Sequence, residues 1–216
     1  MKLSNVRKDL YAEVINLLPY GIEKSSHSLI NNFGDIFILF GFGIVDLKKS
    51  YSTSFYYGIG SHKFSSLYNV IIKEKQLNLS ENNYITACST GQFKLFDEGK
   101  YPIKEYDITT KNDINNIARE VCSYLMNNVF SEWKDKNIGY LERKVNKTPP
   151  YNSNFSGLIL AKFLKNEDYE RIKSEYRLLL NDWVDVYKID LESVISFLEN
   201  HTTEKLHLIS ESKGNI

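Results

Sequence analysis

The stretch Asp35–Asp46 constrains the fold more than any other part of the chain, because it is apolar at odd and even positions alike. A run of this kind, rich in Ile and Phe, is typical of a strand buried on both faces and predicts a central strand. Tyr51–Gly60 is rich in Tyr, Ser, Thr and Phe and predicts a second strand. Lys48–Ser50, between the two, is short enough for a hairpin connection.

Two shorter strands are predicted further along the chain, at Tyr84–Ser89 and Gln92–Phe96. Thr90-Gly91 between them is a turn signal. The stretch Phe64–Leu79 fits either a short helix or an irregular excursion, and the pattern does not decide between them.

Helical spacing of apolar residues predicts two helices in the first two thirds of the chain. The first runs over Asn5–Leu18, with Ser4 as its N-cap. The second keeps apolar residues three and four apart over Ile114–Trp133, about five turns. Thr110 and Asp113 predict a capping box at its start.

The segment Lys147–Asn152 contains two prolines and breaks the helical pattern. It predicts a division into an α+β sheet domain over residues 1–148 and a helical C-terminal segment over residues 149–216, packed on the same domain. Three helices are expected in that segment: Phe155–Leu164, Asn166–Trp183 and Asp190–Leu198. Asn166 and Asp190 are the expected N-caps, Lys165-Asn166 is the expected tight turn, and the tail after His201 is expected to fray.

The order of these elements, a helix followed by strands and then by helices, predicts the α+β class. The expected architecture is an N-terminal helix, an antiparallel sheet of about four strands, a long covering helix, and a C-terminal helical hairpin plus one helix.

Charge excludes one large class of function. The 216 residues carry 27 Lys and Arg against 27 Asp and Glu, a formal net charge of zero. A dedicated nucleic-acid binder normally has a basic excess, because phosphate neutralisation supplies most of its affinity. Nucleic acid is therefore not an expected partner. Hydrophobic residues make up 42% of the chain, enough for a substantial core rather than a disordered tail.

The charges are unevenly distributed. Asn166–Glu199 holds nine acids and four bases, a net charge of −5, so the remainder carries +5. Such a stretch is either a solvated helix face or an acidic docking surface for a basic protein partner. Tyrosines favour contact surfaces as well as ordinary sheet faces. The candidate partner-binding residues are Glu167, Asp168, Glu170, Glu175, Asp182, Asp185, Tyr56 and Tyr57.

The expected compartment is the cytoplasm. Charged residues interrupt Met1–Leu18, so it lacks the apolar core of a secretory signal. Ile36–Val45 is the longest apolar run and is too short to cross a bilayer, so no membrane partner is expected. Cys88 and Cys122 do not have metal-ligand spacing, and two cysteines cannot form a disulfide framework.

An enzyme or small-molecule-binding domain is the alternative, with a site near His62 and Cys88 and with Asp107 as an orienting group. Nothing in the sequence fixes the geometry of these residues. Gly41-Phe-Gly43 lacks the third glycine of a dinucleotide loop, since Asp46 occupies that position. No catalytic residue, cofactor or metal is therefore predicted.

Five segments together resemble a family of small bacterial α+β proteins known as a domain of unknown function. These segments are Phe55–Gly60, Ile85–Cys88, Tyr106–Thr110, Phe130–Trp133 and Leu160–Glu170. The resemblance covers most of residues 1–181 and implies no catalytic residues. Members of this kind occur among candidate immunity proteins of polymorphic-toxin systems. It implies a non-enzymatic protein that neutralises a cognate toxin; a structural adaptor that uses the C-terminal hairpin is a further alternative.

Overall fold

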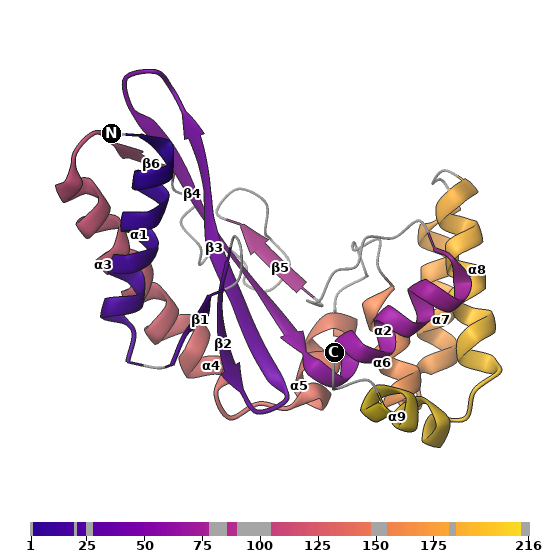
Figure 1. Cartoon of the computed structure of the whole chain (residues 1–216). Helices are drawn as coiled ribbons and strands as arrows, with labels where there is room; N and C mark the ends of the chain where they lie inside the picture. The colour runs from indigo at the N-terminus through magenta and orange to yellow at the C-terminus, as the bar shows by residue number, and fades with distance from the viewer. Residues whose placement is uncertain are drawn as a thin grey trace. The chain divides into compact units, whose positions relative to one another are not determined.

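A computed structural model describes residues 2–19, 21–24, 28–77, 86–89, 105–147, 155–181 and 185–212, with the backbone alone for residues 86–89 and 212. The chain divides into two compact units, whose elements are labelled in Figure 1. Unit 1 comprises Met1–Ile59 and Ala87–Lys136, and unit 2 comprises Gly60–Thr86 and Asn137–Ile216. The class is α+β, as predicted. The boundary predicted at residue 148 lies outside the described residues.

Among the described residues, six strands form one sheet, in the order β1-β2-β3-β4-β5 with β6 also paired to β4. All belong to unit 1 except the last two residues of β4 and the first of β5. The strands are β1 (Glu23–Lys24), β2 (Leu29–Phe33), β3 (Ile36–Asp46), β4 (Tyr51–Ser61), β5 (Thr86–Ser89) and β6 (Glu105–Ile108). The pairs β1–β2, β2–β3 and β4–β6 are antiparallel. The two long strands and their hairpin confirm the prediction, and a hydrogen bond from the Leu47 amide to the Ser50 carbonyl (3.0 Å) closes the hairpin.

Some strands of the sheet were not predicted, because polar sequences form strands here. β2 contains Asn31 and Asn32, and asparagine is depleted in strands. Its pairing with β3 is set instead by the tight turn at Gly34, whose φ is +68°. β6 is equally polar and pairs with the start of β4. The predicted strand Gln92–Phe96 lies outside the described residues.

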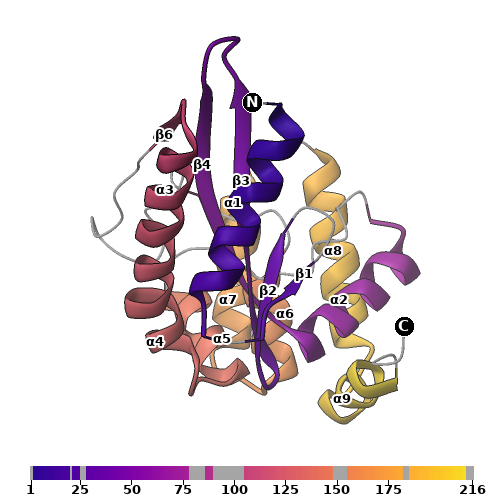
Figure 2. The ribbon, with the colours of Figure 1, turned by 60° about the vertical axis from the view of Figure 1, so that its left-hand side comes forward.

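Two helical elements of unit 1 lie side by side against one face of the sheet, as Figure 2 shows. They are α1 (Leu3–Leu17) and a continuous helical run of α3 (Lys111–Tyr124), a π-helical segment (Leu125–Phe130) and α4 (Ser131–Trp133). Aromatic rings fill the layer between helices and sheet. Phe130 packs on Phe33 and Phe40 at ring-centroid distances of 5.5 and 6.2 Å, and Tyr11 meets Phe42 edge-on at 5.7 Å.

The starts of these two helices were predicted with unequal success. Ser4 is not the N-cap of α1, because the amides of Asn5 and Val6 already donate to the Lys2 carbonyl. The capping box of α3 is confirmed. The Asp113 amide donates to the Thr110 hydroxyl, and the Asp113 carboxylate accepts the Thr110 amide at 2.7 Å.

The helices of unit 2 are α2 (His62–Lys75), α5 (Ile138–Lys147), α6 (Ser156–Phe163), α7 (Tyr169–Leu179), α8 (Asp185–Glu199) and α9 (Thr203–Ser212). The segment that the sequence left undecided, Phe64–Leu79, is therefore helical as far as Lys75. The Ser61 hydroxyl caps this helix by accepting the Phe64 amide. The tail after His201 was expected to fray, but its described part forms α9. Leu206 of α9 is fully buried, and the ring of His207 packs on Phe163 at 4.2 Å.

Two helix starts in unit 2 differ from the prediction. Asn166 is not the N-cap of α7, which begins at Tyr169; instead its side chain accepts the Asp168 amide at 2.7 Å. Asp190 does not cap α8, which begins five residues earlier and encloses Asp190 in the core at 3% exposure. A buried mid-helix carboxylate is rare, so the sequence favoured a capping role.

Candidate functional site

The turn between α6 and α7 is as tight as predicted. Lys165 takes the left-handed conformation, with φ +55°. The Asn166 amide donates to the Ala161 carbonyl at 2.8 Å, and the Lys165 amide donates to Lys162 at 3.3 Å. These two bonds make a Schellman motif, which ends α6 and reverses the chain into α7.

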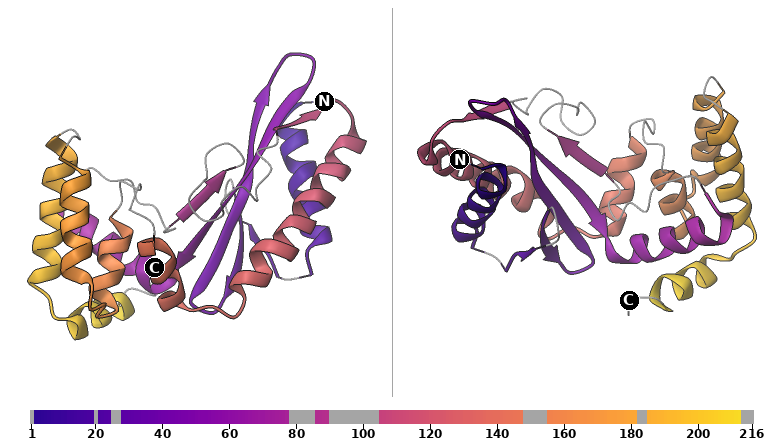
Figure 3. Two further views of the ribbon diagram at one scale, coloured as in Figure 1. Left: turned by 180° about the vertical axis from the view of Figure 1, so that it is seen from behind. Right: turned by 45° about the horizontal axis from the view of Figure 1, so that its top comes forward.

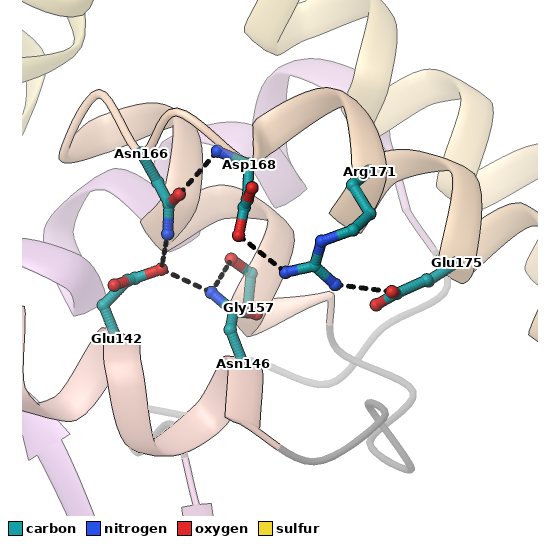
Figure 4. Close-up of polar contacts among 7 residues, drawn as sticks. All are labelled: Glu142, Asn146, Gly157, Asn166, Asp168, Arg171 and Glu175. Atoms are coloured by element: carbon teal, nitrogen blue, oxygen red, sulfur yellow. Dashed lines mark hydrogen bonds and ion pairs between the residues drawn. The ribbon is translucent and has the colours of Figure 1, made fainter.

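A buried polar network fixes the start of α7, as shown in Figure 4. One carboxylate oxygen of Glu142, on α5, accepts the side-chain amides of Asn146 (2.7 Å) and Asn166 (2.6 Å). The side-chain carbonyl oxygen of Asn166 in turn accepts the Asp168 backbone amide. Glu142 is 4% exposed, so its hydrogen bonds are shielded from competing water. The network holds the first turn of α7, and its acidic residues, in place.

Gly157 joins α6 to the same network. The Asn146 side-chain amide donates to its carbonyl at 3.1 Å, and its own amide donates to the Tyr176 hydroxyl of α7 at 3.2 Å. A Cβ at Gly157 would overlap the Asn146 carboxamide. Glycine is required here because the backbone of α6 approaches these side chains so closely.

Ion pairs engage all four bases of the acidic stretch. Arg171 binds Asp168 and Glu175, Lys173 binds Glu170 and Glu199, Arg177 binds Glu192, and Lys188 binds Asp185. The Arg177–Glu192 pair is bidentate, with both nitrogen–oxygen distances 2.7 Å, and it links α7 to α8. The hydrogen bonds from Arg177 hold the pKa of Glu192 below its usual value.

Lys173 provides the second link between these helices. It lies between Glu170 of α7 (2.6 Å) and Glu199 of α8 (2.7 Å), and only 11% of its side chain is exposed. Its ammonium group also lies 5.5 Å from the ring centroid of Tyr169, and that of Lys162 lies 4.9 Å from the same ring. Figure 3 shows α7 and α8 running alongside each other from two sides.

The predicted acidic residues of α7 and α8 thus fall into distinct groups. Asp168, Glu170 and Glu175 share their charge with neighbouring bases. Glu167 is exposed and forms no ion pair with a described residue, and the side chain of Asp185 is 92% exposed with its lysine 3.5 Å away. Asp182 lies outside the described residues. The least compensated carboxylates are therefore Glu167 and Asp185.

The compensating positive charge lies in the same unit. Outside residues 166–199, unit 2 contains ten bases and five acids, a net charge of +5. The net charge of unit 1 is zero. Unit 2 therefore contains both an acidic and a basic region of sequence, with its acids concentrated in residues 166–199.

Three aliphatic side chains are exposed on the two acidic helices, and the sequence did not single them out. They are Leu178 (67% exposed), Val186 (43%) and Ile189 (63%). One signal was present in the sequence: Leu178, Leu179 and Leu180 are consecutive, and three consecutive residues cannot all face the core from a helix.

The two candidate tyrosines lie on unit 1. Tyr57 is 6% exposed and packs on Phe55 and Tyr124 at ring-centroid distances of 6.1 and 6.3 Å. Its ring therefore belongs to the core. Tyr56 is half-buried, and its hydroxyl lies 3.4 Å from the hydroxyl oxygen of Ser28. It also lies over Gly41, where a Cβ would come within 2.6 Å of the Tyr56 hydroxyl.

The residues of the enzyme alternative are spread over both units. His62 is exposed at the start of α2 in unit 2, whereas Asp107 lies on β6 in unit 1. Cys88 is in β5, and its side chain lies outside the described residues. Cys122, on α3, is buried against Val14 of α1, and burial raises the pKa of its thiol to about 11. In the described ranges, no three His, Cys, Asp or Glu side chains are grouped closely enough to hold a metal ion.

Comparison with known proteins gave no family model, no curated protein and no solved structure that matches this chain. No helix in the described part of the chain has the length and apolar character needed to span a membrane.

Proposed function

We propose that the chain is a non-enzymatic protein-binding domain whose α7–α8 hairpin docks a basic partner. The observation that carries the proposal is that ion pairs engage all four bases of residues 166–199 and still leave exposed carboxylates. An acidic surface attracts a basic partner over a distance and accelerates association.

The ion pairs between α7 and α8 support the same role. The pairs made by Lys173 and Arg177 join α7 to α8, and the Glu142 network fixes the turn before α7. A surface whose side chains are already ordered loses less conformational entropy when a partner binds.

Within this proposal, the partner is a basic toxin domain and the chain is its immunity protein. The resemblance of five segments to an uncharacterised family with candidate immunity members motivates this choice, together with the acidic surface. An immunity protein of this kind acts by occluding the toxin's active site rather than by catalysis.

The experiment identifies the gene next to the one for this chain, tests whether it encodes a toxin-type protein, and titrates its product with the chain by calorimetry. Wild-type chain is compared with Glu167→Gln/Asp185→Asn, which removes the two least compensated carboxylates and breaks no short ion pair. We expect weaker binding of the variant and a smaller salt dependence.

The matched control is Glu74→Gln/Glu211→Gln, which removes two exposed carboxylates from α2 and α9 of the same unit. Its affinity should equal that of the wild type. A toxin that binds all three chains equally would contradict the proposal, as would a chromosomal neighbourhood without a toxin gene.

A further inference from the structure

β3 is longer than the strand beside it on the side away from β4. β2 pairs with β3 only as far as Phe40, although β3 continues to Asp46. Figure 2 shows the hairpin of β3 and β4 extending past the end of β2. Among the described residues, β4 is therefore the only strand paired with the last part of β3. The other edge of this part is open to a further strand.

One amide identifies the backbone groups that face this open edge. The Phe42 amide donates to the Tyr11 hydroxyl at 3.3 Å, so it does not belong to the ladder between β3 and β4. Backbone groups of every second residue in a strand point to the same edge. The amides and carbonyls of Ile44 and Asp46 therefore face the open edge too, and no described residue is bonded to them there.

Two features limit the open edge to Gly43–Leu47, which we call the edge window. At one end, the Tyr11 hydroxyl already occupies the preceding amide. At the other end, Lys48 has a left-handed conformation, with φ +71°, and begins the turn into β4. Val45 and Leu47 lie two residues apart, so their side chains point to one face, and they are 60% and 50% exposed.

We propose that the edge window pairs in antiparallel fashion with the edge window of a second copy of this chain. The window pairs over its full length with its own copy only if the two-fold axis passes through its middle residue, Val45. Ile44 then lies opposite Asp46 of the second copy, and these residues exchange both of their backbone hydrogen bonds. The two-fold axis repeats the exchange. This pairing concerns unit 1 and is independent of the acidic docking proposed for unit 2.

The side chains of the edge window favour a second copy over an unrelated strand. Val45 meets Val45 of the second copy, and Leu47 lies opposite Gly43, where no side chain competes for the space. Both exposed aliphatic groups are thereby covered. Asp46 lies opposite Ile44, so like charges do not face each other directly. The paired area is well below the roughly 1,200 Å² of stable complexes, and we expect a weak dimer.

Sedimentation equilibrium of the full chain at up to about 1 mM tests the proposal, because weak pairs associate in this range. The wild type should pass from monomer to dimer as its concentration rises. Val45→Lys sets like charges opposite each other at the axis and should weaken association at least about tenfold. Val186→Lys is the matched control, because Val186 is exposed on α8 of unit 2, and it should associate like the wild type. Unchanged thermal melts would exclude effects through folding.

Disulfide cross-linking locates the axis. The Cα atoms of the two Val45 residues would lie about 4.5 Å apart, within disulfide range. Those of the two Leu47 residues would be separated by four residues of strand, about 14 Å, which is too far. Both variants carry Cys88→Ser, so that buried Cys122 is the only native thiol. On mild oxidation Val45→Cys should form a covalent dimer, and Leu47→Cys should not.

The contrary outcomes are equally defined. A wild type that stays monomeric at about 1 mM would overturn the proposal. A dimer that Val45→Lys leaves intact, or equal cross-linking of Val45→Cys and Leu47→Cys, would place the contact elsewhere and overturn it as well. If hydrogen exchange at the Ile44 and Asp46 amides slows only when the neighbouring gene's product is added, a strand of that protein occupies the edge window and the second-copy proposal is wrong. None of these results bears on acidic docking by α7 and α8.

Discussion

Replacing Glu142 by alanine is expected to destabilise unit 2 more than its size suggests. The carboxylate is 4% exposed and accepts hydrogen bonds from Asn146 and Asn166, at 2.7 and 2.6 Å. Hydrogen bonds to a charged acceptor contribute about 1.5–3 kcal/mol each, so the loss of both costs about 3–6 kcal/mol. Glu142→Gln keeps the acceptor oxygen but not the charge, and it should cost about 1–2 kcal/mol.

Urea unfolding followed by circular dichroism measures this difference. With an m-value of about 2 kcal/mol/M, a loss of 3 kcal/mol lowers the midpoint by about 1.5 M. Hydrogen exchange locates the effect. The Asp168 amide, which is bonded to Asn166, should lose protection in Glu142→Ala and keep most of it in Glu142→Gln.

The exposed Glu74→Gln serves as the control, because surface substitutions usually change stability by less than about 0.5 kcal/mol. An unchanged urea midpoint for Glu142→Ala would refute the claim that the Glu142 network holds the start of α7 in place. If Glu142→Gln were as unstable as Glu142→Ala, the hydrogen-bond argument would be wrong and charge alone would matter.

Three further predictions concern other parts of the chain. Gly41→Ala should lower the free energy of unfolding by about 1–3 kcal/mol in thermal melts, because the added Cβ would meet two tyrosine hydroxyls within 2.7 Å. Gly21→Ala is the control and should be neutral, because a Cβ there would meet nothing within 4 Å. Hydrogen bonds from two threonine amides lower the pKa of Asp113 to about 2. The contribution of this carboxylate to the free energy of unfolding is therefore complete above about pH 4 and is lost as the pH falls towards about 2. Urea titrations at several pH values should show a flatter acid dependence for Asp113→Asn than for the wild type, and parallel curves would contradict this. Leu206→Ala should lower the free energy of unfolding by about 2–5 kcal/mol and should expose residues 203–212 to limited proteolysis. Unchanged stability and proteolysis would show that α9 contributes nothing to the fold.

The sequence predicted the elements whose patterns are regular. The apolar run Asp35–Asp46 forms a strand and the capping box at Thr110 is present, as expected, because both follow from local sequence patterns. Burial on both faces was wrong for the end of the strand, since Gly43, Val45 and Asp46 are exposed. Elements whose own sequence pattern is weak were missed, because the surrounding structure determines them. The polar strand β2 exists because β3 pairs with it, and α9 exists because Leu206 and His207 pack into unit 2.

The sequence predicted the net charge of the candidate site but not the burial and contacts of its residues. The excess of acids between residues 166 and 199 is visible by counting, and these residues include α7 and α8. Counting could not show that Asp190 is buried, nor that Arg177 and Glu192, fifteen residues apart, bind each other. Nor could it link the surface to Glu142, which precedes it by a whole helix.

The central claim is that the acidic α7–α8 hairpin attracts a basic partner. It is tested most directly by the association rate of the neighbouring gene's product, measured by stopped flow at low and at physiological salt. Glu167→Gln/Asp185→Asn should associate more slowly than the wild type at low salt, with the difference shrinking as salt rises and the dissociation rate unchanged. Equal association rates at low salt for the wild type, this variant and Glu74→Gln/Glu211→Gln would contradict the claim.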